Sequence, residues 1–417
     1  MADTFPPDEN RNAGTKKGSK SGKVADFRYK RPSPSKGTGK RERPGGSRKN
    51  SRPNNSARAA PPQSRPGQAA QPYRKSEAYA ALDLGTNNCR LLIARPSGKD
   101  FTVIDAFSRV VKLGEDLATT GRLSDEAMDR ALGALSVCAE KLRRRNVRLA
   151  RSVATEACRR ASNGQDFIER VRRETGIALD VITAEEEARL AVLGCHILLE
   201  EGSGPAVIFD IGGGSTELVL LEKGGSSTGK IPRILDWQSV PWGVVSLTDT
   251  VERRGGDAAA RLNRYTKMRR LVSESFAPFA ERIADAAQSD DIRLLGTSGT
   301  VTTLASLHLE LPHYDRKAVD GLIVPSEAMR AISADLSHMS AYERSELPCI
   351  GQDRANLVVA GCAILESILD LWPARRLGVA DRGIREGILR SLMAAERQSE
   401  RALKTLHENR SEQKRKG

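Results

Sequence analysis

Two stretches of this sequence combine an apolar run, an acidic residue and a glycine-containing turn. In the first, the run from Tyr79 leads to Asp83, and Gly85 opens the turn. In the second, the run from Ala206 leads to Asp210, and a row of three glycines follows. Glycine lacks the Cβ atom that keeps a backbone from closing around an anion, and successive N–H groups in such a turn can point at one phosphate. Both turns therefore predict a phosphate-binding backbone after a buried strand.

The polar side chains at these turns fit the same chemistry. Asp83 and Asp210 stand at the strand ends, where each can hold a hydrated Mg²⁺, because magnesium prefers oxygen ligands and keeps several waters. One glycine-rich turn alone could simply be a tight turn after a core strand. Two copies, with a third glycine turn at 296–300, favour a phosphate site. Its predicted binding residues are Gly85, Thr86, Asn87, Asn88, Gly212, Gly213, Gly214 and Ser215.

The two turns also predict the architecture. Each is followed by a returning apolar strand, Leu91 to Arg95 in the first case and Leu218 to Glu222 in the second. Asp83 and Asp210 thus occupy equivalent places in two halves of one chain. We expect two similar lobes that face each other over a phosphate-bearing ligand.

With these motifs, the chain resembles the exopolyphosphatase and guanosine pentaphosphate phosphatase family, within the superfamily of actin, sugar kinases and heat-shock chaperone ATPases. The resemblance runs from about Ala78 to about Ala395 and includes, besides the two turns, residues 108–115, 153–157, 182–189, 296–304 and 381–387. It implies an α/β fold of two actin-like (ribonuclease H-like) lobes with an interlobe phosphate-binding cleft. The first lobe would span 78–204 and the second 205–396. Homodimers are also an expectation of this resemblance.

The resemblance assigns two catalytic carboxylates. Hydrolysis of a phosphoanhydride requires a water held in line, a base beside it and positive charge on the departing oxygens. By resemblance, Glu156 is the base and Glu187 the second catalytic carboxylate. Without the resemblance, Glu156 could equally be a first-turn carboxylate favoured by the helix dipole. Thr183 and Glu186 form a predicted capping box, which gives Glu186 a structural role.

Two arginines are candidates for contact with phosphate, because guanidinium forks suit phosphate oxygens. Arg109 is the predicted phosphate contact, and Arg90, which closes the first turn, is the other candidate. Either could instead be an ordinary surface arginine.

Charge separates the start of the chain from the rest. The sequence has 417 residues and a net charge of +14, and residues 1–77 carry 19 Lys plus Arg against 6 Asp plus Glu. This segment is rich in Pro, Gly, Ser and Asn, so it cannot bury enough apolar surface to offset its ordering entropy. We predict a disordered basic tail over 1–77, which either contacts polyanions or RNA or serves as a solvated spacer. A short polar C-terminal tail is predicted over 397–417.

Composition also bears on location. No apolar stretch suits a signal peptide or a membrane span, so the prediction is a cytoplasmic protein without membrane contact. The six cysteines show no paired metal spacing, and buried free thiols are the expectation.

Several functions remain open at this stage. The first is an exopolyphosphatase that uses Mg²⁺ or another divalent cation to release orthophosphate from inorganic polyphosphate. The second is a guanosine pentaphosphate 5′-phosphohydrolase that forms guanosine tetraphosphate, which would place it in the stringent response. A third, of another class, is an ATP-binding conformational switch; a nucleic-acid protein acting through residues 1–77 has the least support.

Overall fold

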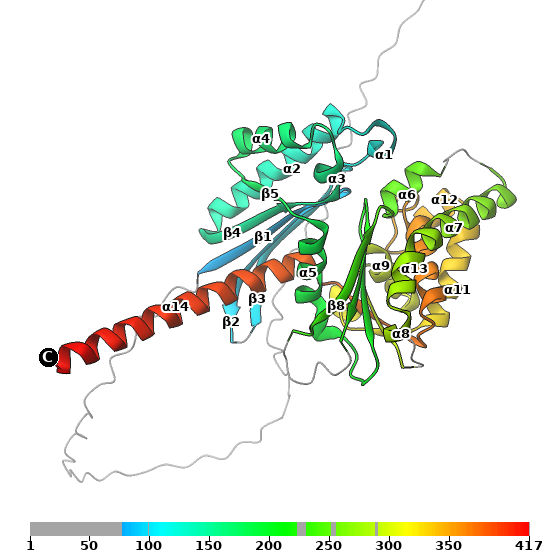
Figure 1. The fold of residues 1–417 in the computed structure, drawn as a ribbon. Helices are drawn as coiled ribbons and strands as arrows, with labels where there is room; N and C mark the ends of the chain where they lie inside the picture. The colour runs from blue at the N-terminus through cyan, green and yellow to red at the C-terminus, as the bar shows by residue number, and fades with distance from the viewer. Residues whose placement is uncertain (1–76, 99, 223–230, 252–255, 288–290, 417) are drawn as a thin grey trace, which may run out of the picture.

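The computed structural model describes residues 77–98, 100–222, 231–251, 256–287 and 291–416 (Figure 1). Within α14, the side chains of 400, 401, 403, 404 and 406–416 are not described. The predicted basic tail lies outside the described residues, apart from Glu77.

The first sheet contains five strands in the order β3-β2-β1-β4-β5. β1 runs antiparallel to β2 and parallel to β4, so the apolar run that ends near Asp83 is the central strand. Every residue of β1 except Asp83 is buried, as expected for a strand covered on both faces. The strands are β1 (Ala78–Leu84), β2 (Asn88–Ser97), β3 (Asp100–Val110), β4 (Val147–Ala154) and β5 (Leu179–Val181).

The second sheet contains six strands in the order β10-β11-β9-β6-β7-β8. Strands β8-β7-β6-β9-β11 repeat the order and directions of β3-β2-β1-β4-β5, and β10 is added at the edge. The predicted repeat of one lobe within the chain is therefore confirmed. The strands are β6 (Ala206–Ile211), β7 (Thr216–Leu221), β8 (Ile234–Val240), β9 (Arg293–Thr297), β10 (Ile323–Pro325) and β11 (Arg376–Ala380).

Helices of the first lobe cover one face of its sheet. The longest of them is α2 (Asp125–Arg144), and the Ser124 side chain accepts a hydrogen bond from Ala127 N–H at its start. Its buried residues join those of β1 and β2 in one core with Phe167. The other helices of this lobe are α1 (Leu117–Thr120), α3 (Glu156–Arg160) and α4 (Gly164–Thr175).

A larger helical layer covers the outer face of the second sheet (Figure 1). Phe276 and Phe279, both fully buried, anchor its longest member, α7, in the core. The helices are α6 (Val244–Thr250), α7 (Ala258–Arg282), α8 (Ala284–Ala287), α9 (Gly299–His308), α10 (Arg316–Val319), α11 (Ser326–His338), α12 (Ala341–Glu346) and α13 (Val358–Leu371).

Two helices are exchanged between the lobes. α5 (Ala184–Cys195) follows the first sheet in the chain, yet its Ala188 and Val192 pack on the second sheet. α14 (Ile384–Lys416) follows the second sheet, yet its Ile388 and Leu389 pack on the first. The predicted boundary at residue 204 divides the sequence into two segments, but each segment contributes a helix to the core of the other lobe. The segment 384–396 packs on the first sheet.

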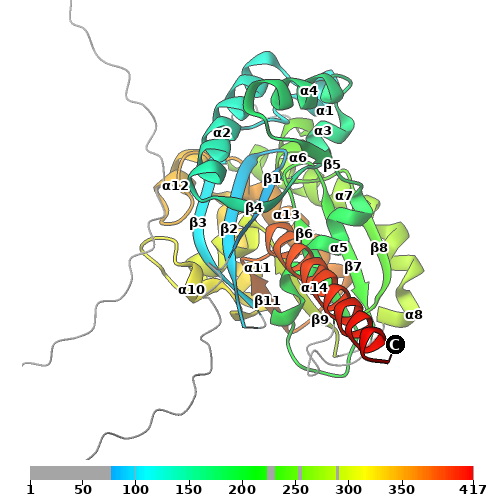
Figure 2. The ribbon, with the colours of Figure 1, turned by 90° about the vertical axis from the view of Figure 1, so that its left-hand side faces the viewer.

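Glycines bring the two exchanged helices together, and they lie side by side in Figures 1 and 2. A Cβ atom at Gly387 would overlap the carbonyl oxygen of Leu190, and one at Gly194 would overlap that of Gly383. Close backbone packing of α5 against α14 therefore requires glycine at both positions.

The last helix is longer than expected. We predict a polar tail from residue 397, whereas α14 continues as a helix to Lys416 and extends past the first sheet (Figure 1). Its polar residues are good helix formers, and the packed first turns remove the cost of nucleation. None of the helices in the described ranges has an apolar stretch long enough to cross a bilayer.

Candidate active site

The first glycine turn joins β1 to β2. Gly85 N–H donates to the carbonyl oxygen of Asn88 at 2.9 Å and closes the turn. The segment after β3 braces the turn from outside, because Val111 N–H donates to the Asn87 carbonyl at 2.9 Å and Gly114 N–H donates to that of Thr86 at 2.9 Å. The turn therefore has a fixed backbone, and its own side chains remain directed at the cleft that they line.

The second glycine turn joins β6 to β7 in the same way. Gly212 N–H donates to the Ser215 carbonyl at 2.9 Å. Its brace is the start of α6, where Val245 N–H donates to the Gly213 carbonyl at 2.8 Å and Ser246 Oγ donates to that of Gly214 at 2.9 Å.

The two turns meet at Thr86. A Cβ atom at Gly213 would lie 2.9 Å from Thr86 Cβ, and one at Gly214 would lie 2.7 Å from Thr86 Oγ1 and 2.9 Å from Glu156 Cγ. Real Cβ atoms do not approach so closely, so the close contact between the two turns requires glycine at these positions. The contact places both turns and Glu156 at one cleft.

The predicted site residues converge on this cleft, with one exception. All eight predicted phosphate-binding residues of the turns, both catalytic candidates and both metal candidates line it. These are Asp83, Gly85, Thr86, Asn87, Asn88, Glu156, Glu187, Asp210, Gly212, Gly213, Gly214 and Ser215.

Arg109 is the exception, because it is not among the described residues that line the cleft. It is paired with Cys89 on the neighbouring strand, and cross-strand partners point to the same face of a sheet. Cys89 is buried in the core under α2, and the Arg109 guanidinium lies 5.3 Å from the centre of the Phe107 ring. Arg90, the next residue along β2, lines the cleft. A role for Arg109 in phosphate binding therefore stays a prediction without support from its position.

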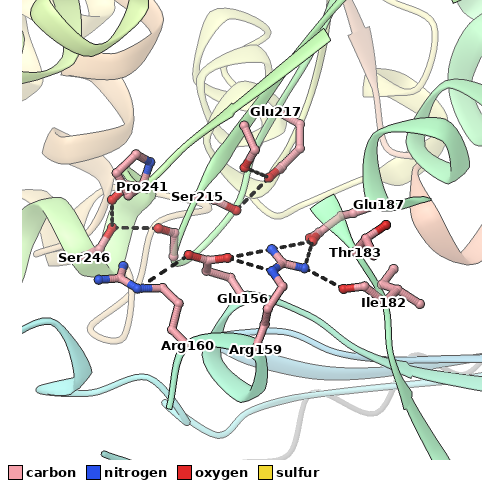
Figure 3. A network of polar contacts seen from close by, with 12 residues as sticks. Glu156, Arg159, Arg160, Ile182, Thr183, Glu187, Ser215, Glu217, Pro241 and Ser246 are labelled. Carbon is pink, nitrogen blue, oxygen red and sulfur yellow. Dashed lines mark hydrogen bonds and ion pairs between the residues drawn. The ribbon is translucent and has the colours of Figure 1, made fainter. Parts of the chain in front are cut away.

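The two catalytic candidates share one arginine (Figure 3). Arg159 Nη2 donates to Glu156 Oε2 at 2.5 Å, and Arg159 Nη1 donates to Glu187 Oε2 at 3.2 Å. Sequence reasoning assigned no role to Arg159. Its spacing of three residues from Glu156 on one helix was a signal that could have revealed it.

Glu217 is a second residue that the sequence prediction missed. Its side chain is 2 % exposed, lines the cleft, and accepts hydrogen bonds at Oε1 from Ser215 Oγ at 2.7 Å and Ser239 Oγ at 2.9 Å. Position was the available signal, since Glu217 lies directly opposite Asp210 in the register of β6 and β7.

The third glycine turn also reaches the cleft. Ser298, Gly299 and Thr300, at the start of α9, line it together with Arg354. Arg354 Nη1 donates to Thr303 Oγ1 at 3.2 Å, so its guanidinium lies at the same end of α9.

Four of the acidic side chains that line the cleft have raised pKa values. Asp83 and Asp210 keep part of their surface open to the cleft, but their carboxylates are surrounded by protein, and this desolvation raises the pKa of both. For Asp210 the pKa reaches about 8, with Glu217 as the next cause. Desolvation and then the Glu217 charge raise the pKa of Glu187 well above its usual range, and desolvation also raises that of Glu217. A cation in the cleft would relieve this accumulation of carboxylates.

The donor set fits a hydrated divalent cation. Asp83 Oδ1 and Asn87 Oδ1 are buried and have no hydrogen-bond partner among the described residues. In the same ranges, no three His, Cys, Asp or Glu side chains are grouped closely enough to hold a metal by themselves. Mg²⁺ suits such a site, because it usually takes one or two carboxylates and completes its shell with water and substrate phosphates. The six cysteines are free thiols, and five of them are buried, as expected, whereas Cys349 is half-buried.

The fold and the cleft together define a class, that of two-lobed α/β proteins with a glycine-lined cleft between the lobes. Residues 92–396 match the family model described as the Ppx/GppA phosphatase family. The chain is 31% identical over 327 residues to a protein named exopolyphosphatase 2 from Mycobacterium tuberculosis, covering 75% of this chain and 98% of that relative. The chain belongs to the Ppx/GppA phosphatase family.

Solved structures agree with this assignment and with the actin-like two-lobe fold. An exopolyphosphatase from Cytophaga hutchinsonii has a TM-score of 0.67 at 25% identity, covering 76% of this chain and 98% of that one. An Aquifex aeolicus member of the Ppx/GppA family has a TM-score of 0.61 at 27% identity, covering 77% and 98%. The predicted family and fold class are confirmed.

Proposed function

We propose that this protein is an exopolyphosphatase, which releases orthophosphate from the end of an inorganic polyphosphate chain with the help of Mg²⁺ or another divalent cation. The observation that carries the proposal is the meeting of two glycine turns with Glu156 at one cleft, where Gly214 has no space for a Cβ atom between Thr86 and Glu156. A terminal phosphate held by the turns would lie beside the candidate base.

Each group then has one task. The N–H groups of Gly85 and of Gly212 to Gly214, with the side chains of Thr86, Asn87, Asn88 and Ser215, hold the phosphate oxygens. Asp83 and Asp210 would hold the cation, which supplies positive charge to the departing oxygens when bound.

Glu156 and Glu187 orient the attacking water, and Glu156 accepts its proton. The new bond joins the water oxygen to the terminal phosphorus, and the anhydride P–O bond breaks. Orthophosphate leaves, and the remaining chain is one phosphate shorter.

Hydrolysis of guanosine pentaphosphate to guanosine tetraphosphate is the second candidate. The cleft continues from the two turns to Ser298, Gly299 and Arg354 at the start of α9. These polar groups could contact parts of a ligand beyond its terminal phosphate, as a nucleotide substrate would require.

The test is phosphate release from long-chain polyphosphate and from guanosine pentaphosphate, measured side by side with Mg²⁺. The proteins are the wild type, Glu156→Ala, and Glu169→Ala as a control on the exposed face of α4. We expect release from polyphosphate to fall by about 10³-fold in Glu156→Ala, within the range for loss of a general base, and to be unchanged in Glu169→Ala.

Other outcomes would change the conclusion. Release mainly from the nucleotide would favour the second candidate. Release from neither substrate, together with tight binding of ATP, would reject a hydrolytic function and favour the conformational switch.

Three further expectations belong to this proposal. The protein would act in the cytoplasm and as a homodimer, which light scattering coupled to gel filtration would test. Residues 1–77 would add contact with polyanions, either polyphosphate or RNA. Deletion of that segment should then weaken polyphosphate binding more at low salt than at high salt.

A further inference from the structure

All three guanidinium nitrogen atoms of Arg159 donate hydrogen bonds (Figure 3). Nε and Nη2 donate to Glu156 Oε2 at 3.2 and 2.5 Å. Nη1 and Nη2 donate to Glu187 Oε2 at 3.2 and 3.3 Å. Nη1 also donates to the carbonyl oxygen of Ile182 at 2.7 Å, just before α5 begins.

This arrangement fixes orientation as well as charge. A guanidinium is planar and rigid, so two carboxylates bound to its two edges have a defined separation and angle. Arg159 binds one oxygen, Oε2, of Glu156 and of Glu187. The other oxygen of Glu156, Oε1, lies 3.7 Å from Arg160 Nε. A lysine ammonium is a single point donor and could not reproduce this geometry.

The two carboxylates also belong to elements with different packing. Glu156 begins α3, and its neighbours Ala157 and Cys158 are part of the first-lobe core. Glu187 is on α5, and its neighbour Ala188 packs on the second sheet. Leu190 of the same helix lies in the cluster of the first sheet, so α5 contacts both lobes. Arg159 therefore joins a carboxylate of the first lobe to one on a helix that lies between the two lobes.

A simple surface ion pair does not explain these features. Arg170 offers the comparison, because it too bridges two carboxylates, Asp129 at 2.7 Å and Glu174 at 2.9 Å. That bridge connects helices on the outside of the first lobe, where the acids are largely exposed. The partners of Arg159 line the cleft and are 13% and 9% exposed in their side chains.

We propose that Arg159 is a positioning residue for the hydrolysis, which holds Glu156 and Glu187 at the separation and orientation that activate the attacking water. The inference rests on the proposed function, because it needs both carboxylates to act on that water. Arg159 itself would act through the carboxylates and would not need to contact the substrate.

Three variants test this role. Arg159→Ala should lower kcat by about 100-fold, the loss expected when a catalytic group is displaced by about 1 Å, with KM changed less than about threefold. Arg159→Lys should stay at least about tenfold below wild type in kcat, since a point charge cannot bridge the two carboxylates. Arg170→Ala is the matched control and should keep the wild-type kcat.

Rescue by methylguanidinium is a second readout. If Arg159 only stabilised the fold, added methylguanidinium would not raise the kcat of Arg159→Ala. Added to Arg159→Ala, it should restore kcat at least about tenfold by occupying the emptied site. A wild-type kcat in Arg159→Lys, or a loss in Arg159→Ala that appears only in KM, would overturn the proposal.

A double-mutant cycle separates this inference from the proposed function. In the Glu156→Gln background, Arg159→Ala should lower kcat by less than about a further threefold, because the effects of residues that act as a unit are not additive. The same cycle is measured by thermal unfolding, which needs no turnover. If the wild type released phosphate from neither substrate, the proposed function would fail. Additive unfolding effects of Arg159→Ala and Glu156→Gln would then reject the coupling as well.

Discussion

The two lobes share a topology but differ in charge at one equivalent position. Asp83 ends the central strand of the first sheet and lies opposite Arg90 on the next strand. Asp210 ends the central strand of the second sheet and lies opposite Glu217. An aspartate therefore lies opposite a cationic arginine in the first lobe and opposite a glutamate in the second lobe.

This difference in neighbouring charge shifts the pKa values of the two aspartates in opposite directions. Desolvation raises the pKa of Asp83, and Arg90 opposes that shift. Desolvation also raises the pKa of Asp210, but there Glu217 adds to the shift and the value reaches about 8. The first lobe thus has a cation of its own for an anionic ligand, whereas the second lobe has excess negative charge that a bound metal would neutralise.

The glycine turns of the two lobes should respond differently to the same substitution. Gly214→Ala should lower kcat/KM by about 100-fold, because the new Cβ atom must displace Thr86 or Glu156, 2.7 and 2.9 Å away. Gly85→Ala should remain within about threefold of wild type, since its Cβ would have ordinary contacts at 3.6 Å or more. Steady-state phosphate release measures both. Equal losses would show that the two turns are not distinguished by their contact with the other lobe.

Arg90→Gln and Glu217→Gln should affect different parameters. Arg90→Gln should raise KM by about tenfold, the cost of one charge-assisted hydrogen bond to phosphate, with little change in the Mg²⁺ requirement. Glu217→Gln keeps an oxygen that can accept from Ser215 and Ser239 but removes a charge near Asp210. It should raise the Mg²⁺ concentration for half-maximal activity by about tenfold. A Mg²⁺ titration at fixed substrate and a substrate titration at saturating Mg²⁺ separate the two. Identical shifts in both variants would contradict a division of roles between the lobes.

The smallest expected effect is on the stability of the metal-free protein. Between about pH 4 and pH 8, folded Asp210 keeps a proton that the unfolded chain releases, so its contribution to stability decreases as pH rises. Asp210→Asn removes this titration, and its melting temperature should exceed that of wild type by an amount that grows to about 5 °C at pH 8.5. Asp83→Asn should show a smaller increase, because the main charge effect on Asp83 is that of Arg90, which lowers its pKa, whereas the main charge effect on Asp210 is that of Glu217, which raises it. Thermal unfolding in chelator across this pH range measures the differences. A constant offset at all pH values would contradict the burial of an acid with a raised pKa.

Local sequence patterns were sufficient for most of the fold. The apolar run at Ala206–Ile211 is a strand that is buried except for Asp210, as predicted. Thr183 caps α5 as predicted, since its side chain accepts from Glu186 N–H at 3.1 Å. In a capping box the Glu186 side chain would also accept from the Thr183 backbone N–H. Here the Glu186 carboxylate binds Arg151 and Arg189 instead. Caps depend on neighbouring residues, whereas the partners of a free carboxylate depend on the whole fold.

The positions of Arg90 and Arg109 could not be predicted from local sequence patterns. Arg90 and Arg109 lie on the paired strands β2 and β3, but side chains alternate between the faces of a strand. Arg109 is paired with Cys89, so it points to the face under α2, and Arg90 points to the cleft. The register of β2 with β3 decides between them, and the sequence alone did not provide it.

The sequence by itself determined the two acid-and-glycine turns and the residues that form them, because a glycine turn after a buried strand is a property of consecutive residues. It also determined that Thr183 caps the helix that carries Glu187. Only the tertiary structure decided that Arg159 joins those two carboxylates, that Glu217 faces Asp210, and that α5 and α14 each pack on the other lobe's sheet. These contacts form between segments distant in the chain, so they exist only after both lobes have folded and packed together.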